Sequence, residues 1–266
     1  MDHASAHHAS PRKQGEILVT NDTSIGRGEP DAPPMCIGVI ETGELPAQLV
    51  GEFADYPEMV SRWLAPFMGP ADEFRAIRVV AGEALGSPSD CDGYVITGSR
   101  FGVYDPIPWL PALEAFILAC GQFQTPVFGI CFGHQLMAKA YGADVKKSAR
   151  GWGCGIQSYN VLEMGEMALP VSVFHQDQVL TVPEGARIVG GNEFCPIGML
   201  DFGRKGRSVQ FHPEFQDGYC AALLELRTVV PQTIREKAKA TLQQAPDVAT
   251  AARWAASYFA GFRARR

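Results

Sequence analysis

One cysteine of this chain stands between two glycines, at a point where a strand would give way to a helix. Residues 126–135 read PVFGICFGHQ, with glycines two positions before and two positions after Cys131. The residues before the cysteine have β-strand composition, and residues 136–141 have helical composition. This layout is typical of a nucleophile elbow, a sharp strand-to-helix turn that lifts a reactive side chain out of a sheet.

The elbow pattern carries a chemical expectation and a structural alternative. Glycines suit such a turn because bulkier side chains would collide with neighbouring backbone. A cysteine at the start of a helix is favoured as a thiolate, since backbone N–H groups and the helix dipole stabilise negative charge there. The alternative is a buried cysteine in an ordinary strand-to-helix turn, because Gly-x-x-x-Gly spacings are common in α/β proteins.

A second motif, SVQFHPEF at residues 208–215, supplies a base and an acid. Residues 207–211 have strand composition, and His212 and Glu214 are two positions apart, so an extended chain projects both from one face. Pro213 favours that extended backbone. A cysteine nucleophile needs a nearby base, and the base needs an orienting carboxylate. We therefore predict a Cys131, His212 and Glu214 triad, with a surface turn as the alternative for His-Pro-Glu alone.

Together the two motifs resemble the class I, triad-type glutamine amidotransferases, over most of residues 35–220. The resemblance is strongest to the free-standing, GMP-synthase-like members, and it extends to the γ-glutamyl peptidases of the same superfamily. It implies an α/β fold of three layers, flavodoxin-like, in which a mixed and largely parallel sheet is flanked by helices.

The resemblance also implies an oxyanion hole. Residues 92–100, DGYVITGSR, resemble the strand and glycine turn that contribute one backbone amide, here at Gly98 and Ser99. Phe132, directly after the cysteine, would contribute a second backbone N–H. The turn reads Thr-Gly-Ser-Arg where many relatives have Ser-Gly-Gly-Pro, which puts its geometry in doubt.

Four further residues correspond to the family's substrate pocket. Gln135 matches the glutamine four positions past the nucleophile. His175, Gln176 and Asp177 match a His-Gly-Asp segment whose main chain helps to hold glutamine, with Gln176 in place of the commoner glycine. We expect these four residues to contact the substrate, in a pocket that differs in detail from that of the relatives.

The implied activity is cleavage of a γ-glutamyl amide through a thioester, with ammonia passed to an acceptor. The chain shows no Gly-x-x-x-x-Gly-Lys-Ser/Thr phosphate loop and no room for a second catalytic domain. Ammonia would therefore go to a separate synthetase subunit, or the protein is a stand-alone hydrolase of γ-glutamyl amides or peptides. A non-catalytic regulatory module of the same fold is a further alternative. No cofactor is expected.

A metal site is the remaining chemical alternative. Cys131, His134, His175 and His212 could be imagined as its ligands, but metal sites usually show tighter pairs of ligands in sequence. His134 would also point along the helix of the elbow. We expect no metal.

Composition agrees with an enzyme of modest size. The 266 residues are 46% hydrophobic, which suffices for one well-buried α/β domain. The net charge of −6 argues against a nucleic-acid or anionic-membrane partner. No apolar run approaches the ~20 residues of a membrane helix, and residues 1–14 lack the apolar core of a secretory signal. Seven scattered cysteines suit a reducing cytoplasm.

Three segments are expected along the chain. Residues 1–34, rich in Ala, Ser, His, Gly and Pro, are predicted to form a disordered tail. Residues 35–225 are predicted to form the amidotransferase domain, and residues 226–266 a helical extension packed on it. The last helix would begin after Asp247 as N-cap, with packing against a second subunit as the alternative.

Within the domain, the patterns predict alternating strands and helices. Strands are expected at 35–40, 74–80 and 94–97, and helices at 45–67 and 111–122. Several short runs between 155 and 213 predict an antiparallel edge to the sheet. Strands separated by helices favour a parallel core, whose carboxyl ends would place Cys131 at the ligand-binding edge.

Overall fold

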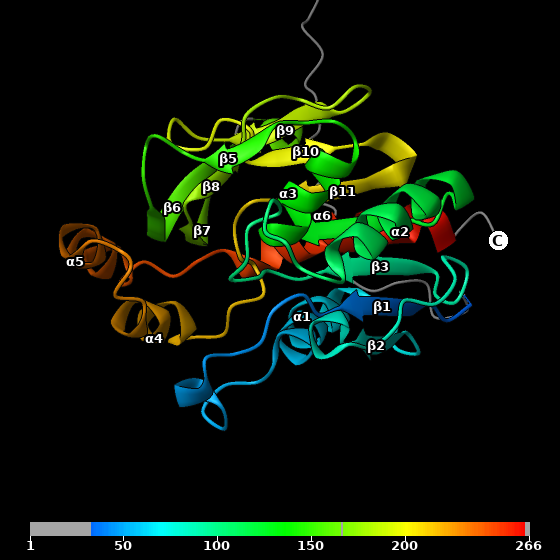
Figure 1. The fold of residues 1–266 in the computed structure, drawn as a ribbon, viewed down its shortest axis with the longest axis horizontal. Helices are drawn as coiled ribbons and strands as arrows, with labels where there is room; N and C mark the ends of the chain where they lie inside the picture. Colours follow the sequence, from blue (N-terminus) through cyan, green and yellow to red (C-terminus); the bar gives the residue numbers. More distant parts are fainter. Residues whose placement is uncertain (1–32, 166, 264–266) are drawn as a thin grey trace, which may run out of the picture.

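A nine-stranded mixed sheet forms the centre of the protein in a computed structural model that describes residues 33–165 and 167–263 (Figure 1). The strand order is β2-β1-β3-β4-β11-β10-β9-β6-β7. The predicted tail, residues 1–34, lies outside the described residues except for its last two positions.

One half of the sheet is parallel and the other antiparallel. The parallel strands are β2 (Glu73–Ile77), β1 (Cys36–Ile40), β3 (Gly93–Ile96), β4 (Val127–Ile130) and β11 (Gly206–Val209). The antiparallel strands are β10 (Met199–Asp201), β9 (Arg187–Gly191), β6 (Gly153–Val161) and β7 (Met167–His175). A separate two-stranded ribbon pairs β5 (Val145–Lys147) with β8 (Asp177–Val179). The predicted mixed α/β sheet with an antiparallel edge is confirmed.

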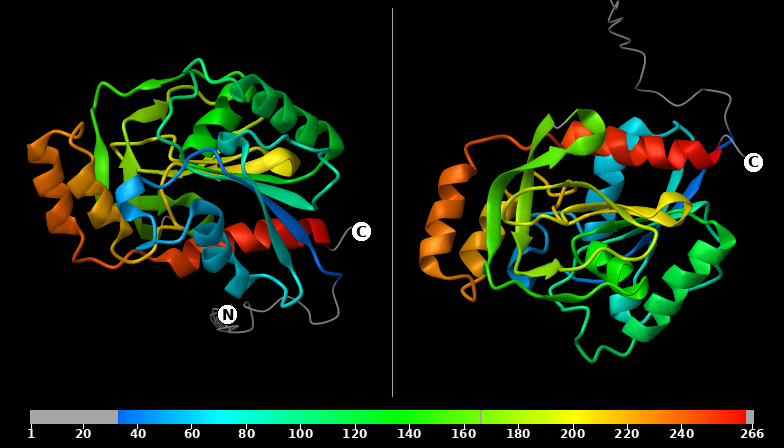
Figure 2. Two further views of the ribbon diagram at one scale, coloured as in Figure 1. Left: turned by 60° about the horizontal axis from the view of Figure 1, so that its bottom comes forward. Right: turned by 90° about the horizontal axis from the view of Figure 1, so that it is seen from above.

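Helices cover both faces of the parallel half, as the right-hand view of Figure 2 shows. On one face lie α1 (Tyr56–Leu64) and α6 (Val248–Arg263), and on the other α2 (Leu110–Phe123) and α3 (Phe132–Ala140). Successive side chains along a strand point to opposite faces of the sheet and so enter both layers. Phe128 lies in the core cluster beneath α1 and α6, while Val127 lies in the one beneath α2 and α3. The three-layer architecture therefore follows from strands that are apolar on both faces.

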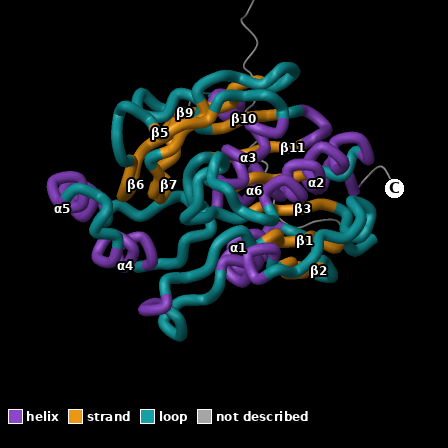
Figure 3. Tube along the Cα trace, viewed as in Figure 1, coloured by secondary structure: helices purple, strands orange, loops and turns teal. Residues whose placement is uncertain are grey.

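Two shorter helices lie apart from these layers. α4 (Tyr219–Leu226) and α5 (Gln232–Thr241) pack beside β6 and β7, and loops connect them to the rest of the fold (Figure 3). The apolar residues Cys154, Leu224, Val230 and Ala238 form a small buried cluster between them and the sheet. This part of the chain thus adds a wall at the antiparallel half of the sheet.

Several element boundaries differ from the sequence prediction. The helix expected at 45–67 is mostly loop until Tyr56, where the Asp55 side chain accepts the Glu58 N–H at 2.9 Å and caps α1. The strand expected at 74–80 ends at Ile77. The strand expected at 207–211 ends at Val209, because the Gln210 N–H turns to the carbonyl of Gly198 at 2.8 Å.

The last helix begins where its cap was expected. The Asp247 carboxylate accepts the Thr250 N–H at 3.0 Å, and α6 starts at Val248. Its Trp254 and Phe259 are buried in the core cluster on one face of the sheet. The Trp254 indole donates to Glu163 at 2.9 Å, which ties the helix to the antiparallel half. The division into residues 35–225 and an extension of 226–266 stays a prediction.

Candidate active site

Cys131 occupies a strained turn between β4 and α3. Its backbone has φ +50° and ψ −97°, and Gln124 is the only other non-glycine with positive φ among the described residues. Such a conformation costs about 1–3 kcal/mol and persists only when the surroundings enforce it. Here the Cys131 N–H donates to the carbonyl of Val209 at 2.8 Å, and its own carbonyl accepts from Gln135 N–H at 3.0 Å. The elbow predicted from the sequence is confirmed in its geometry.

The two flanking glycines let α3 cross closely over the strands. A Cβ at Gly129 would lie 2.6 Å from the carbonyl carbon of Gly133, and one at Gly133 would lie 2.4 Å from the carbonyl oxygen of Ile96. Both contacts are with backbone, which cannot move aside cheaply. The collision expected from the sequence is therefore the reason that this turn has glycines on either side.

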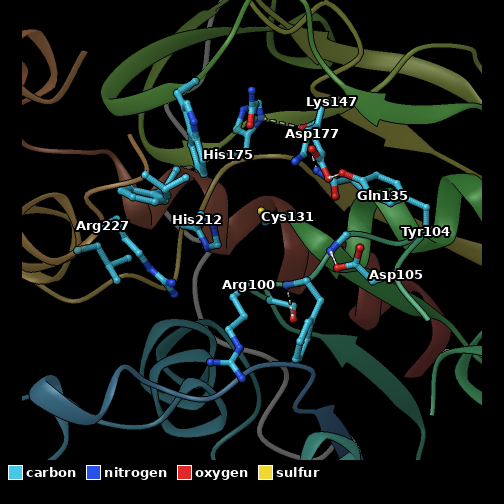
Figure 4. A pocket seen from close by; sticks show the side chains of 18 of the residues that line it. Arg100, Tyr104, Asp105, Cys131, Gln135, Lys147, His175, Asp177, His212 and Arg227 are labelled. Atoms are coloured by element: carbon cyan, nitrogen blue, oxygen red, sulfur yellow. Dashed lines mark hydrogen bonds between the residues drawn. The ribbon is translucent and has the colours of Figure 1, made fainter. Parts of the chain in front are cut away.

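His212 lies beside the cysteine, just after the end of the adjacent strand β11 (Figure 4). The Nδ1 atom of His212 is 2.8 Å from Oε1 of Glu214, and both side chains are buried. The sequence prediction assumed an extended chain through these residues, but residues 210–211 form a bend and residues 213–214 a turn. The turn still brings the pair together, so the three predicted triad residues form one group.

Burial and the neighbouring side chains act on the pKa of His212 in opposite directions. Burial disfavours the imidazolium, but attraction from Cys131 and Glu214, with hydrogen bonds to both, outweighs it and raises the pKa of His212 to about 10. The ring is therefore a cation at neutral pH. An imidazolium hydrogen-bonded to Cys131 stabilises negative charge on its sulfur.

The turn after β3 lies against the histidine. A Cβ at Gly98 would lie 2.7 Å from Cε1 of His212, so only glycine fits there without a shift. The Gly98 carbonyl accepts from the hydroxyls of Thr42 and Thr97, each at 3.2 Å. Since the carbonyl and N–H of one peptide point in opposite directions, this directs the Ser99 N–H away from Thr42. That N–H makes no hydrogen bond within the described part of the chain.

Comparison with known proteins identifies the family. Residues 85–224, which are 140 of the 266 in the chain, match the sequence model of the family described as Glutamine amidotransferase class-I.

The chain belongs to the class-I glutamine amidotransferase family.

Individual relatives agree with this assignment. "Gamma-glutamyl peptidase 3" of Arabidopsis thaliana is 27% identical over 59% of this chain and 69% of that protein. "GMP synthase [glutamine-hydrolyzing]" of Aromatoleum aromaticum is 34% identical over 46% of this chain, but this stretch is only 25% of that protein. A solved glutamine amidotransferase from Methylobacillus flagellatus superposes with a TM-score of 0.65, at 19% identity, over 87% of this chain and 94% of its own. The last likeness shows the fold, which is the one expected.

In this amidotransferase the residues expected at the substrate form a hydrogen-bonded wall. The Gln135 amide donates to the carbonyl of Asp177 at 2.9 Å and to Oε1 of Gln210 at 3.0 Å. Nδ1 of His175 lies 3.0 Å from the same Asp177 carbonyl. Burial lowers the pKa of His175 to about 4, so its ring is neutral. The structure brings Gln135, His175, Gln176 and Asp177 to one side of the cavity, with the Gln135 amide engaged by the protein itself.

A cavity of about 310 Å³ opens at Cys131. His212 and Ser99 line it, and so do Tyr104 and Trp152. Its volume is at the lower end of the range for small-molecule sites. Seven of the ten predicted site residues line this space, which can hold an amino-acid-sized ligand.

Four residues at this site were not predicted from the sequence. Gln210 is fully buried, and its amide lies 3.5 Å from Sγ of Cys131. It stands two positions before His212, and this spacing could have indicated that it belongs to the site. Thr42 follows the first strand in a Glu-Thr-Gly turn, a position next to the ligand-binding edge. Arg100 and Arg227 line the cavity too, and only Arg100 stands in a motif.

His134 does not face the cavity. Its ring is fully buried between the Ser208 hydroxyl at 2.7 Å and the Ile197 carbonyl at 3.1 Å. Burial lowers the pKa of His134 to about 3, which keeps the ring neutral. It therefore belongs to the packing of α3 on β11 rather than to the imagined set of metal ligands.

Within residues 33–165 and 167–263, no three His, Cys, Asp or Glu side chains are grouped to hold a metal ion. The helices of these ranges are also too short or too polar to cross a membrane.

Proposed function

We propose that this protein cleaves the amide bond of γ-glutamyl compounds through a thioester on Cys131. The observation that carries the proposal is the strained elbow that presents Cys131 to a His212 held by Glu214 at 2.8 Å. A nucleophile, its base and an orienting carboxylate are the three groups that such acyl transfer needs.

The proposed reaction has two steps. The thiolate of Cys131 attacks the γ-carbonyl carbon, and the backbone N–H groups of Phe132 and of the turn at Gly98 and Ser99 hold the oxyanion. The His212 imidazolium gives its proton to the leaving amine, and the carbon–nitrogen bond breaks. Water then attacks the γ-glutamyl thioester while His212 takes its proton, which releases glutamate and restores the thiolate. Glu214 stabilises the imidazolium in the first step and again when it re-forms.

The leaving amine defines two forms of this proposal. With glutamine it is ammonia, which would pass to a separate synthetase subunit, and the likeness to part of a GMP synthase supports this form. With a γ-glutamyl peptide it is an amino acid or peptide, and the enzyme works alone. The relatives named γ-glutamyl peptidase support the second form, because this chain matches 69–80% of the length of three of them.

We also propose a catalytic unit of residues 35–225 with a helical extension of 226–266, acting in the cytoplasm. The packing of α6 in the core supports the extension as part of the folded enzyme. All seven cysteines are free of disulfides, although two of them, Cys36 and Cys91, have sulfurs only 3.1 Å apart. The odd number of cysteines and their scattered spacing are the observation that supports a reducing compartment.

Replacing the cysteine tests the proposal. Cys131→Ala should lower glutamate release from a γ-glutamyl anilide at least about 10⁴-fold, as loss of a nucleophile does in other hydrolases. Cys36→Ala, which removes a thiol remote from the cavity, is the matched control and should keep full activity. Thermal unfolding of both variants checks that they fold. Unchanged activity in Cys131→Ala, or a wild-type protein that neither releases glutamate nor is labelled at Cys131 by a glutamine-analogue alkylator, would favour the non-catalytic module.

A further inference from the structure

The charged side chains around Cys131 are divided between two sides of the cavity (Figure 4). On one side lie Asp177, Lys147 and Asp105, so both signs of charge are present. On the other side lie Arg100 and Arg227, which are cations only. The reactive sulfur lies between a region of mixed charge and a purely cationic one.

The region of mixed charge matches the amino-acid head of a γ-glutamyl compound. Lys147 and Asp177 are direct partners in the register of β5 and β8, so their side chains share one face. The Tyr104 hydroxyl donates to the Asp177 carboxylate at 2.8 Å and fixes it. A carboxylate and an ammonium side by side complement the α-ammonium and α-carboxylate of a glutamyl head. The γ-carbonyl would then lie at Cys131, and the leaving amine would point to the arginines.

The two arginines have no anion of their own. Neither guanidinium forms an ion pair or a side-chain hydrogen bond with any residue that the structure describes. Arg100 follows Ser99 directly and stacks over the Phe101 ring at 5.0 Å, which restrains it at the cavity. Arg227 is half-buried at the end of α4, beyond the residues that match the family. An unpaired guanidinium in a cleft is suited to bind a carboxylate in a bidentate manner.

The cleft continues past the arginines. A second cavity of about 400 Å³ is lined by residues 44–48, by Leu226 and again by Arg100 and Arg227. The arginines therefore stand where the two cavities adjoin. Glu44 is the carboxylate in this second space, and it makes no ion pair with either arginine in the described part of the chain. There is room here for a leaving group much larger than ammonia.

We infer that Arg100 and Arg227 bind a carboxylate on the leaving group, and that the preferred substrate is a γ-glutamyl amino acid or short γ-glutamyl peptide rather than glutamine. This inference rests on the proposed function and assigns its specificity. The γ-glutamyl amide bond breaks, Cys131 keeps the glutamyl group as a thioester, and the amine leaves with the proton of His212 while its carboxylate stays on the arginines. Arg227 supplies this preference from a segment that the family match does not include.

Three substrates and four proteins test the inference. The substrates are γ-glutamylglycine, its neutral analogue γ-glutamylglycinamide, and glutamine. The proteins are the wild type, Arg100→Gln with Arg227→Gln as a double variant, Arg227→Gln alone, and the control Arg62→Gln, which removes an exposed cation paired with Glu58 on α1. We expect the wild type and the control to favour γ-glutamylglycine over the amide at least about tenfold in kcat/KM, as for a charge-assisted contact. The double variant should lose this preference and keep its activity on the amide within about twofold.

The possible failures are distinguishable. Equal kcat/KM for γ-glutamylglycine and its amide in the wild type, or a preference that survives in the double variant, overturns the inference and leaves the proposed function intact. Hydrolysis of none of the three substrates, without labelling of Cys131, overturns the proposed function and the inference with it. Equal losses on both substrates in the double variant would show a structural effect and also overturn the inference.

Discussion

The two sides of the active-site cavity are built differently. On the side of the parallel strands, Cys131, the turn at Gly98 and His212 follow β4, β3 and β11, which are neighbours in the sheet. The opposite side is the outer wall, which takes in both charged regions around the cysteine: Lys147 and Asp177 come from the β5–β8 ribbon, and Arg227 comes from the end of α4. The first side leaves no space for an added methyl group at three glycines, whereas Lys147 is exposed and Arg227 is half-buried.

This difference separates chemistry from recognition. Adjacent parallel strands end at the same edge of the sheet. The residues that directly follow these strands therefore lie close together, whichever side chains the protein surface has. Backbone bonds such as Cys131 N–H to Val209 carbonyl then hold the reacting groups in place. The outer wall uses side chains on loops and on a short helix, which can change without disturbing the sheet. We therefore expect substitutions on the first side to lower activity strongly, and substitutions on the second side to lower it only slightly.

Among the substitutions that compare the two sides and keep the triad intact, the largest effect is expected at Gly98. Gly98→Ala would place a Cβ 2.7 Å from Cε1 of His212, and the ring or the turn must shift. Because displacement of a reacting group by about 1 Å can cost on the order of a hundredfold in rate, we expect kcat/KM to fall about 100-fold. Steady-state hydrolysis of a γ-glutamyl anilide measures it.

Gly261→Ala is the matched control for this substitution. Gly261 lies in α6 with nothing within 4 Å of an added Cβ. Alanine should leave activity unchanged and raise the free energy of unfolding by about 0.5–1 kcal/mol, since glycine is a poor helix former. A Gly98→Ala enzyme as active as this control would contradict the prediction that the side formed by the ends of the parallel strands is rigid.

The second effect concerns pH and His212. Its pKa is about 10 in the folded protein and near 6.5 when unfolded, so the folded state holds the extra proton between these values. The stability from this group is complete below pH 6.5 and is lost as the pH rises toward 10, at up to ~1.4 kcal/mol per pH unit. Chemical denaturation of the wild type and His212→Gln at pH 6.5, 8 and 9.5 measures the slopes. Identical slopes in the two proteins would show that the charged cluster does not exist.

The smallest effect is expected on the outer wall. Tyr104→Phe removes one hydrogen bond to Asp177 from a side chain that is 48% exposed. We expect KM for a γ-glutamyl substrate to rise about threefold with kcat unchanged. A loss in kcat larger than that of Gly98→Ala would reverse the comparison between the two sides.

Local motifs were sufficient to predict much of this protein. The glycines around Cys131 and the spacing of His212 and Glu214 are motifs of a few consecutive residues, so the elbow and the family could be inferred from them. The predicted boundaries of α1 and β11 were wrong. The true boundaries depend on the Asp55 cap and on the hydrogen bond from Gln210 to Gly198, which helix and strand propensities do not describe. Gln135 was expected at the substrate, but its amide is engaged by Gln210 and Asp177, which are distant in sequence.

By itself the sequence determined which groups could react: a cysteine in a turn that requires glycines, a histidine and a glutamate two positions apart. These follow from the chemistry of the side chains and from motifs that can be recognised within a few consecutive residues. Only the tertiary structure decided what lies opposite them. Arg100 and Arg227 are 127 positions apart in the chain, and they share a cleft because α4 packs beside β6 and β7 and ends at the loop that follows β3. Long-range packing places such charges, and no local pattern encodes it.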